Sequence, residues 1–237
     1  MLRNYVIVDL ETTGLRADTD KIIEIGAIKV ENGQESIYNS FVNPEVPISE
    51  RIVEIVGITD EMVKDAPKIS DIIGEFIEFT KDLPLLGHNL LFDFGFLKTA
   101  AVQNGYKFQK NGLDTLDIAR KYLPELESRK LEYLCKYFGI HDEQHHRAWN
   151  DAKVTGQLYH ILCEKFENME DKNKKVFEPK ELHFEIKKAS PITPRQKSYL
   201  NSLLLKHGIK PDYIIDELTK SEASRIIDRI LSKHGMS

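Results

Sequence analysis

The 237-residue chain is poor in cysteine and lacks any long apolar run. Cys135 and Cys163 are its only two cysteines. They do not have the close spacing of a metal-binding pair, and two thiols are too few to form a disulfide framework in a chain of this length. No stretch approaches the roughly 18 consecutive apolar residues of a membrane helix, and the chain does not open with the basic and then apolar segments of a secretion signal. We therefore expect a cytoplasmic protein with reduced cysteines and no membrane association.

Negative charge prevails overall, but it is unevenly distributed. The net charge is −5, and residues 171–237 hold 14 Lys+Arg and 9 Asp+Glu, so residues 1–170 hold 19 and 29. An acidic body with a mildly basic tail suits an enzyme that binds metal through carboxylates and a tail that meets an anionic partner. A solvated tail without a partner fits the same charges, so both interpretations stay open.

Two carboxylates interrupt the first apolar stretch of the chain. Residues 5–8 have high β preference and predict a buried strand that continues through Asp9 and Glu11. Side chains two residues apart on a strand point to the same face, so the two acids converge before the turn at Gly14. Two charges about 4 Å apart repel by roughly 4 kcal/mol at an effective dielectric near 20, which favours a divalent cation between them. Taken alone, however, such a pair more often merely ends a strand and caps a turn.

The patterns that follow predict a mixed α/β domain. Residues 22–30 and 37–42 are rich in Ile and Val and flank Asn32-Gly33, a strong hairpin signal. The first three strands should therefore form an antiparallel meander. A short strand at 83–86 leads to a helix that starts near Leu90 and is apolar nearly all round, as expected of a buried helix.

Three further residues of ambiguous role lie at the starts of predicted helices. Asp93 lies in the apolar helix, where an ionised carboxylate is costly unless it favours the helix dipole or binds a metal. His146 and Asp151 lie at the mouth of a later helix with an apolar stripe over 148–162. A lone loop histidine is usually just solvated, and an acid in a first helical turn usually just favours the dipole. None of the three residues decides function by itself.

The composition divides the chain into three segments. Residues 1–167 carry the patterns above, residues 168–190 are charged and poorly periodic and predict a linker, and residues 191–237 predict a small helical unit. Thr193 and Gln196 frame a capped helix start with a proline at its first position. At about 45 residues this unit is marginal as a free-standing fold, so we expect it to dock on the first domain, on itself or on a partner.

Metal-assisted phosphodiester hydrolysis needs carboxylates for two divalent ions about 3.5–4 Å apart and a base of near-neutral pKa for the attacking water. Three motifs stand in order over roughly residues 3–165. They are Val8-Asp9-Leu10-Glu11-Thr12-Thr13-Gly14-Leu15, Gly87-His88-Asn89-Leu90-Leu91-Phe92-Asp93-Phe94-Gly95-Phe96-Leu97 and His146-Arg147-Ala148-Trp149-Asn150-Asp151. Through these motifs the sequence resembles the DEDDh 3′→5′ exonucleases, the DnaQ-like family that includes the proofreading epsilon subunit of DNA polymerase III.

The resemblance implies the ribonuclease-H-like fold, a mixed five-stranded sheet with helices on both faces, followed here by the small all-α unit. It also implies two divalent metal ions, Mg²⁺ or Mn²⁺. Their ligands in the family match Asp9, Glu11, Asp93 and Asp151.

The resemblance assigns further roles residue by residue. The family's general base matches His146 rather than the neighbouring His145, because only His146 has the spacing to Asp151. Positions that seat the terminal nucleotide in the family match Thr12, Leu15 and Asn89.

The implied activity is that of a 3′→5′ exonuclease, similar to the polymerase III epsilon subunit, which releases nucleoside monophosphates from 3′ ends of single-stranded DNA in proofreading or repair. An exoribonuclease of the RNase T or oligoribonuclease kind stays open, because the sequence does not reveal how the 2′-hydroxyl is treated. A non-catalytic nucleic-acid-binding scaffold is a third hypothesis, against which the intact acid set argues. Residues 166–190 hold no convincing clamp-binding segment of the epsilon type, and residues 191–237 are a candidate contact for a DNA polymerase or another replication or repair protein.

Overall fold

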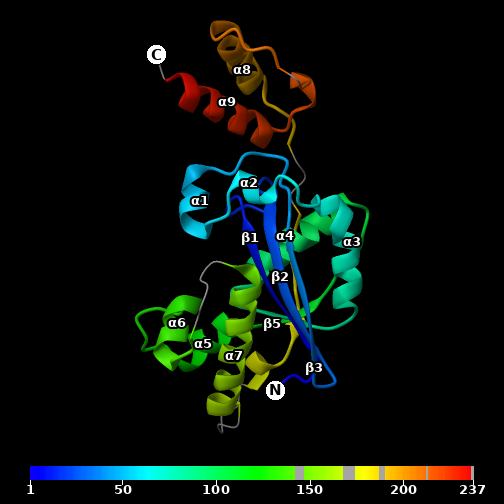
Figure 1. Ribbon diagram of the computed structural model, residues 1–237, viewed down its shortest axis with the longest axis vertical. Coiled ribbons are helices and arrows are strands. Elements are labelled where there is room, and N and C mark those ends of the chain that lie inside the picture. The colour runs from blue at the N-terminus through cyan, green and yellow to red at the C-terminus, as the bar shows by residue number, and fades with distance from the viewer. Residues whose placement is uncertain (142–146, 168–173, 187–189, 212, 236–237) are drawn as a thin grey trace. The chain divides into compact units, whose positions relative to one another are not determined.

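The computed structural model describes residues 1–237 except 142–146, 168–173, 187–189, 212 and 236–237 (Figure 1). The chain divides into two compact units, Met1–Glu185 and Ile186–Ser237. Each unit has its own clusters of buried apolar side chains, which is the usual basis for treating two segments as distinct folding units. None of the helices in the described part of the chain is both long enough and apolar enough to cross a membrane.

A mixed sheet in the order β3-β2-β1-β4-β5-β6 forms the centre of the first unit (Figure 1). Its strands are β1 (Tyr5–Thr12), β2 (Ile22–Glu31), β3 (Gln34–Phe41), β4 (Leu85–Gly87), β5 (Asn111–Asp114) and β6 (Lys180–Glu181). The first three strands form an antiparallel meander, whereas β4 runs parallel to β1, and β5 to β4. Asn32 and Gly33 have φ values of 54° and 79°, as a two-residue hairpin turn of type I′ requires, so the predicted hairpin is confirmed.

Helices cover both faces of this sheet, as predicted (Figure 1). Even-numbered residues of β1, such as Val6 and Val8, pack against α3 and α4, whereas odd-numbered ones, such as Tyr5 and Ile7, pack against α5, α6 and α7. The alternation of faces along a strand therefore places the side of β1 that carries the two acids toward α7. The helices of the unit are α1 (Glu50–Val56), α2 (Asp60–Val63), α3 (Ile69–Thr80), α4 (Leu90–Gln103), α5 (Thr115–Tyr122), α6 (Leu131–Phe138) and α7 (Ala148–Phe166).

The sheet has six strands rather than the predicted five, because part of the predicted linker over 168–190 folds into the first unit. The short helix η1 (Lys174–Phe177) precedes β6, which pairs antiparallel with β5. Phe177 and Leu182 are 6% and 7% exposed, and Phe184 packs against the core beside α4. The linker prediction is thus wrong for residues 174–185, and the first unit ends at Glu185 rather than at 167. A few apolar residues among the charges are enough to bury the segment.

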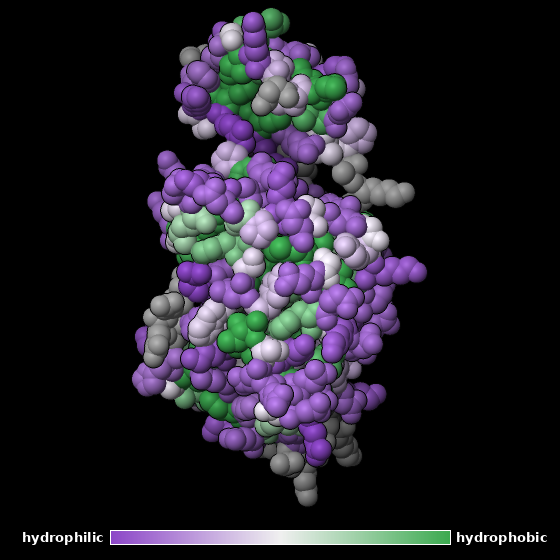
Figure 2. All heavy atoms as spheres, turned by 45° about the vertical axis from the view of Figure 1, so that its right-hand side comes forward, coloured by the Kyte–Doolittle hydropathy of each residue, from purple (hydrophilic) through white to green (hydrophobic). Residues whose placement is uncertain are grey.

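The second unit is all-helical, which confirms the predicted fold class of this part of the chain. It contains α8 (Pro194–Lys206), the short helix η2 (Ile215–Glu217) and α9 (Lys220–His234). Both long helices begin with a capping box, Thr193 with Gln196 in α8 and Thr219 with Glu222 in α9. Their apolar faces meet in one cluster that includes Leu200 and Ile227. On the face of this unit that Figure 2 shows, hydrophilic side chains border the apolar ones that reach the surface.

The burial of Phe177 and Leu182 generates a stability prediction. A chain that ends at Glu185 should retain the melting temperature of the first unit, whereas a chain that ends at Glu167 should lose about 3–6 kcal/mol, because each buried Phe or Leu side chain contributes roughly 1.5–3 kcal/mol. Urea unfolding of the two truncated chains, followed by circular dichroism, measures the difference. Equal unfolding free energies would contradict the assignment of residues 174–185 to the core.

Candidate metal centre

Three carboxylates meet at the end of β1. One ligand oxygen from each of Asp9, Glu11 and Asp151 lies within 4.8 Å of the others. Asp9 and Glu11 are two residues apart on β1 and share the face that is turned toward α7, and the first turn of α7 carries Asp151. The structure thus brings together three of the four predicted metal ligands, from segments 140 residues apart in sequence.

Gly26 on β2 allows α7 to reach this position. It is the register partner of Asp9 in the antiparallel pair. A Cβ atom at Gly26 would lie 2.1 Å from both the carbonyl carbon of Ala148 and the amide nitrogen of Trp149, far inside any real contact distance. Because only glycine leaves this space, the first turn of α7 rests on the sheet here, and that contact brings Asp151 to Asp9.

Asp93, the fourth predicted ligand, does not belong to the group of three but lies close to it. It is 4% exposed, and its Oδ1 accepts a hydrogen bond of 3.1 Å from the backbone N–H of Leu10. The strand β1 pairs with β4 only at Val6 and Ile7, so Asp93 occupies the side of β1 where no strand continues. After burial, the charge of Asp93 is the largest cause that raises the pKa of Asp9, which places both carboxylates in one electrostatic environment.

Asp114 fixes the helix start that carries Asp93. Its carboxylate accepts hydrogen bonds of 2.9 Å from the backbone N–H groups of Asn89 and Leu90 at the start of α4, and of 2.9 Å from that of Leu116 in α5. One side chain therefore caps two helices. Asn89 has a φ of 67°, a left-handed conformation in which asparagine is several-fold enriched.

Burial and mutual repulsion raise the pKa values of the carboxylates. The pKa of Glu11 is raised to about 8, first by burial and then by the charges of Asp151 and Glu24. The pKa of Asp9 lies well above its usual range, first because of burial and then because of the charges of Asp93 and Asp151. Burial also raises the pKa of Asp93, although a backbone hydrogen bond opposes the shift. Such perturbed groups are typical of functional sites.

An ion pair between Glu24 and Arg147 borders the cluster. Glu24 lies opposite Glu11 in register and has 0% exposure. Its carboxylate accepts hydrogen bonds from Nη2 of Arg147 at 2.8 Å, from Nε of Arg147 at 3.2 Å and from the backbone N–H of Ala148 at 3.2 Å. The guanidinium also lies 4.7 Å from the ring centre of Phe41. The pair therefore anchors the first turn of α7, on which the third carboxylate of the cluster lies.

The donor set fits a hard divalent cation. Carboxylate oxygens are the ligands that Mg²⁺ and Mn²⁺ prefer. Opposite charge favours the ionised form of acids whose pKa values are raised by burial and repulsion. Binding of a cation should therefore release protons from this cluster.

The other predicted site residues lie at the ends of β1 and α4 or outside the described residues. Thr12 is 8% exposed, and its hydroxyl donates a hydrogen bond of 2.7 Å to the carbonyl of Gly14. Leu15, on the turn after β1, is 85% exposed. Asn89 lies exposed at the N-cap of α4. His146, the predicted base, falls outside the described residues.

Sequence reasoning missed the residues that position the cluster. Glu24 offered a signal, because a charged residue inside a run of β-branched residues has to find a partner once the strand is buried. Asp114 offered another, as an acid between a short strand and a helix. The contact at Gly26 had no local signal, because the helix that meets it begins more than a hundred residues later.

Comparisons with known proteins identify the family of the chain. A family model described as "Exonuclease" matches residues 6–159. The chain is 40% identical over 166 residues to the PolC-type DNA polymerase III of Caldanaerobacter subterraneus subsp. tengcongensis, and 43% identical over 157 residues to that of Bacillus subtilis. These alignments cover 70% and 65% of this chain but only 12% and 11% of the two relatives. The chain therefore spans a small part of the length of the curated relatives that it matches.

Solved structures share the fold of the first unit. A structure of exonuclease X in complex with 5′ overhanging duplex DNA has a TM-score of 0.54 and 26% identity, and the match covers 68% of this chain and 91% of that one. A structure of E. coli exonuclease I in complex with a dT13 oligonucleotide has a TM-score of 0.62 and 20% identity, with coverage of 68% and 41%. The second likeness shows the fold alone.

The raised pKa of Glu11 generates a prediction about stability. Its pKa of about 8 in the folded protein exceeds the ordinary value of 4.5, so the folded state binds this proton more tightly than the unfolded state does. The stability of the metal-free protein should therefore fall as the pH rises from about 4.5 to about 8. Glu11→Gln should reduce this fall and raise the melting temperature at pH 8.

Differential scanning calorimetry in the presence of a chelator, at pH 5.5 and pH 8, measures this effect. The exposed Glu54→Gln in α1 is the matched control and should behave as the parent. Identical pH dependence in Glu11→Gln and the parent would refute the electrostatic account of the cluster.

Proposed function

Since the chain belongs to the exonuclease family whose model matches residues 6–159, we propose that it is a metal-dependent 3′→5′ exonuclease that releases nucleoside monophosphates from single-stranded DNA. The observation that carries the proposal is the convergence of Asp9, Glu11 and Asp151, with Asp93 beside them. A pure binding surface has no use for four neighbouring carboxylates, whereas phosphodiester hydrolysis with metal ions requires them.

We propose DNA rather than RNA as the substrate because of the names of the relatives. The two polymerases at 40% and 43% identity are named DNA polymerase III, and the exonuclease X structure at 26% identity holds duplex DNA with a 5′ overhang. A role in proofreading or repair follows from the same likeness. A structure titled as a 3′-exonuclease that recognises a histone mRNA stem-loop is only 17% identical and shows the fold alone.

The carboxylates are proposed to hold two ions, Mg²⁺ or Mn²⁺. Asp9, Glu11 and Asp151 would bind one, and Asp93 together with Asp9 would contribute to the second. Divalent ions at such a site polarise the phosphoryl oxygen, lower the pKa of bound water and stabilise the leaving oxygen. The protein's part is to fix these four side chains, through the pleat of β1, the contact at Gly26 and the caps on α4.

His146 is proposed to be the general base that takes a proton from the attacking water. It directly precedes Arg147, whose guanidinium is tied to the buried Glu24. A histidine with an unperturbed pKa near 6.5 is largely neutral at pH 7.5 and can accept that proton.

Thr12, Leu15 and Asn89 are proposed to seat the 3′-terminal nucleotide. Leu15 supports this role through its 85% exposure on the turn after β1, because an exposed leucine offers an apolar face to a base. Asn89 lies at the N-cap of α4, four residues before Asp93.

Two alternatives to this proposal differ from it in substrate or in activity. An exoribonuclease would differ in how it treats the 2′-hydroxyl, and a non-catalytic scaffold would bind strands without shortening them.

We also propose that residues 191–237 contact a DNA polymerase or another replication or repair protein, since the relatives are polymerases.

The activity should appear on a 5′-labelled single strand of 20 nucleotides. The parent should shorten the DNA strand from its 3′ end with Mg²⁺ or Mn²⁺ and leave it intact with a chelator, and it should act more slowly on RNA of the same sequence. Asp151→Asn should lower the rate by orders of magnitude, because it removes one of three clustered ligands, whereas Glu54→Gln should retain it. Gel analysis of products decides between the hypotheses: internal cuts contradict an exonuclease, faster RNA cleavage selects the exoribonuclease, and binding without cleavage selects the scaffold.

His146→Ala should lower turnover by about 10²–10⁴, the usual contribution of a positioned base, and should flatten the acidic limb of the pH–rate profile. Titration calorimetry with Mn²⁺ should show that metal binding survives. His145→Ala is the neighbouring control and should have a far smaller effect. If His145→Ala proves to be the inactive variant, the base is misassigned.

A further inference from the structure

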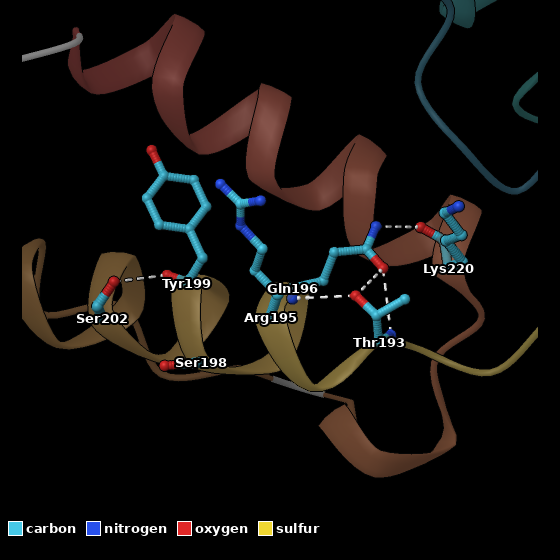
Figure 3. Close-up of a pocket in the computed structure, with 7 residues that line it drawn as sticks. All are labelled: Thr193, Arg195, Gln196, Ser198, Tyr199, Ser202 and Lys220. Atoms are coloured by element: carbon cyan, nitrogen blue, oxygen red, sulfur yellow. Dashed lines mark hydrogen bonds between the residues drawn. The ribbon is translucent and has the colours of Figure 1, made fainter.

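The second unit contains a hollow of about 840 Å³ along the first turns of α8 and the start of α9 (Figure 3). Its lining includes two cationic residues, Arg195 and Lys220, one aromatic residue, Tyr199, and the serines Ser198 and Ser202. All of these residues belong to Ile186–Ser237. The hollow is therefore a feature of the second unit itself and plays no part in the metal centre.

Hydrogen bonds fix the floor of the hollow. Nε2 of Gln196 donates a bond of 2.8 Å to the carbonyl of Lys220, and Oε1 of Gln196 accepts from the backbone N–H of Thr193 at 3.2 Å (Figure 3). The same Nε2 also donates a bond of 2.8 Å to the hydroxyl of Ser224. The backbone N–H of Lys220 donates a bond of 2.8 Å to the carbonyl of Ser190. The starts of α8 and α9 are thus tied together, and the hollow is preformed.

Arg195 and Lys220 lie at positions where the helix dipole disfavours a positive charge. Arg195 is the second residue of α8 and Lys220 is the first residue of α9, both at the positive ends of helix dipoles. The first turn of α8 has no acidic residue. Within the described part of the chain, neither side chain forms an ion pair. A bound anion would turn this unfavourable arrangement into a favourable one.

The charge of the whole unit points the same way. Residues 186–237 hold 10 Lys+Arg and 5 Asp+Glu, whereas residues 1–185 hold 23 and 33. A polyanionic strand is therefore repelled on average by the first unit and attracted by the second.

The presence of Tyr199 favours a nucleic acid strand over a simple anion as the ligand of the hollow. Its ring is 46% exposed and projects from α8 on the same side as the guanidinium of Arg195 (Figure 3). An aromatic face beside cations is the combination that binds single strands, because the ring stacks on an unpaired base while the cations neutralise phosphates. Bases in a duplex are already stacked and do not offer this face.

We propose that this hollow binds a single-stranded segment of nucleic acid, with Arg195 and Lys220 on phosphates and Tyr199 against a base. The inference rests on the proposed function, since it assigns the second unit to the same strand whose 3′ end the first unit shortens. Its consequence is tighter binding of long strands than of substrates that fill only the nuclease site.

The test uses the full chain in a chelator and a 5′-fluorescein-labelled dT20, followed by fluorescence anisotropy. Arg195→Glu/Lys220→Glu should weaken binding at least tenfold and reduce the slope of log K against log salt by about 1.4, at roughly 0.7 per lost phosphate contact. Tyr199→Leu should weaken binding about five- to hundredfold and leave the salt slope unchanged. Lys210→Glu, on the loop after α8, carries the same charge change as each single substitution and should bind nearly as the parent.

The melting temperature of the double variant is the control for loss of folding. It should not fall, because a glutamate at a helix N-terminus interacts favourably with the helix dipole. Hydrolysis of the p-nitrophenyl ester of thymidine 5′-monophosphate, with Mn²⁺, should be equal in the parent and the double variant.

Four outcomes of these measurements test strand binding by the hollow separately from the proposed nuclease activity. Parent-like binding of dT20 by the double variant, or an equal loss in Lys210→Glu, would overturn the inference. Absence of dT20 binding by the parent would also overturn it and leave an acidic protein as the partner of this surface. Weakened binding in the double variant together with an ester that the parent does not cleave would uphold the hollow and count against the nuclease activity.

Discussion

The repulsion among carboxylates at the end of β1 is the constraint on which the rest of the first unit depends. Two unit charges about 4 Å apart cost roughly 4 kcal/mol at an effective dielectric near 20, and burial adds to that cost. The fold nevertheless holds Asp9, Glu11 and Asp151 together. It does so because apolar packing around β1 and α7 fixes the backbone positions from which the three side chains extend. The unfavourable energy of the metal-free cluster favours the cation binding proposed above.

The pair of Glu24 and Arg147 shows how the fold avoids neutralising that cluster. A free guanidinium beside Glu11 would compete with a metal ion for the same carboxylates. Here the guanidinium donates two hydrogen bonds to the carboxylate of Glu24, at 2.8 and 3.2 Å, and the two charges largely cancel. Arg147 only partly offsets the causes that raise the pKa of Glu11. The pair therefore supplies a structural anchor for α7 and leaves the acids of the cluster without a cationic partner that fully offsets their raised pKa values.

The acids that the structure brings together could be predicted from the sequence, whereas the residues that position them could not. Asp9 and Glu11 could be predicted to converge because two residues that are two positions apart on a strand point to the same face. Gly26 does not, because its requirement arises from a helix that is distant in sequence. The sixth strand was missed for a related reason: β6 spans only Lys180–Glu181, and it pairs because Leu182 finds an apolar site next to β5. Tertiary packing decided these cases, and local propensity carries little of that information.

The distribution of charge between the two units follows from the chemistry of the first. The proposed metal centre is favoured by a negative surface, and residues 1–185 carry 33 Asp+Glu against 23 Lys+Arg. The same surface repels a phosphodiester chain, since screening over about 8–10 Å at physiological salt leaves nearby charges active. Making the surface around the centre basic would weaken its hold on metal ions. In the proposal above, a separately folded unit, with its own apolar core and cations at the starts of two helices, supplies the positive charge that the first unit lacks.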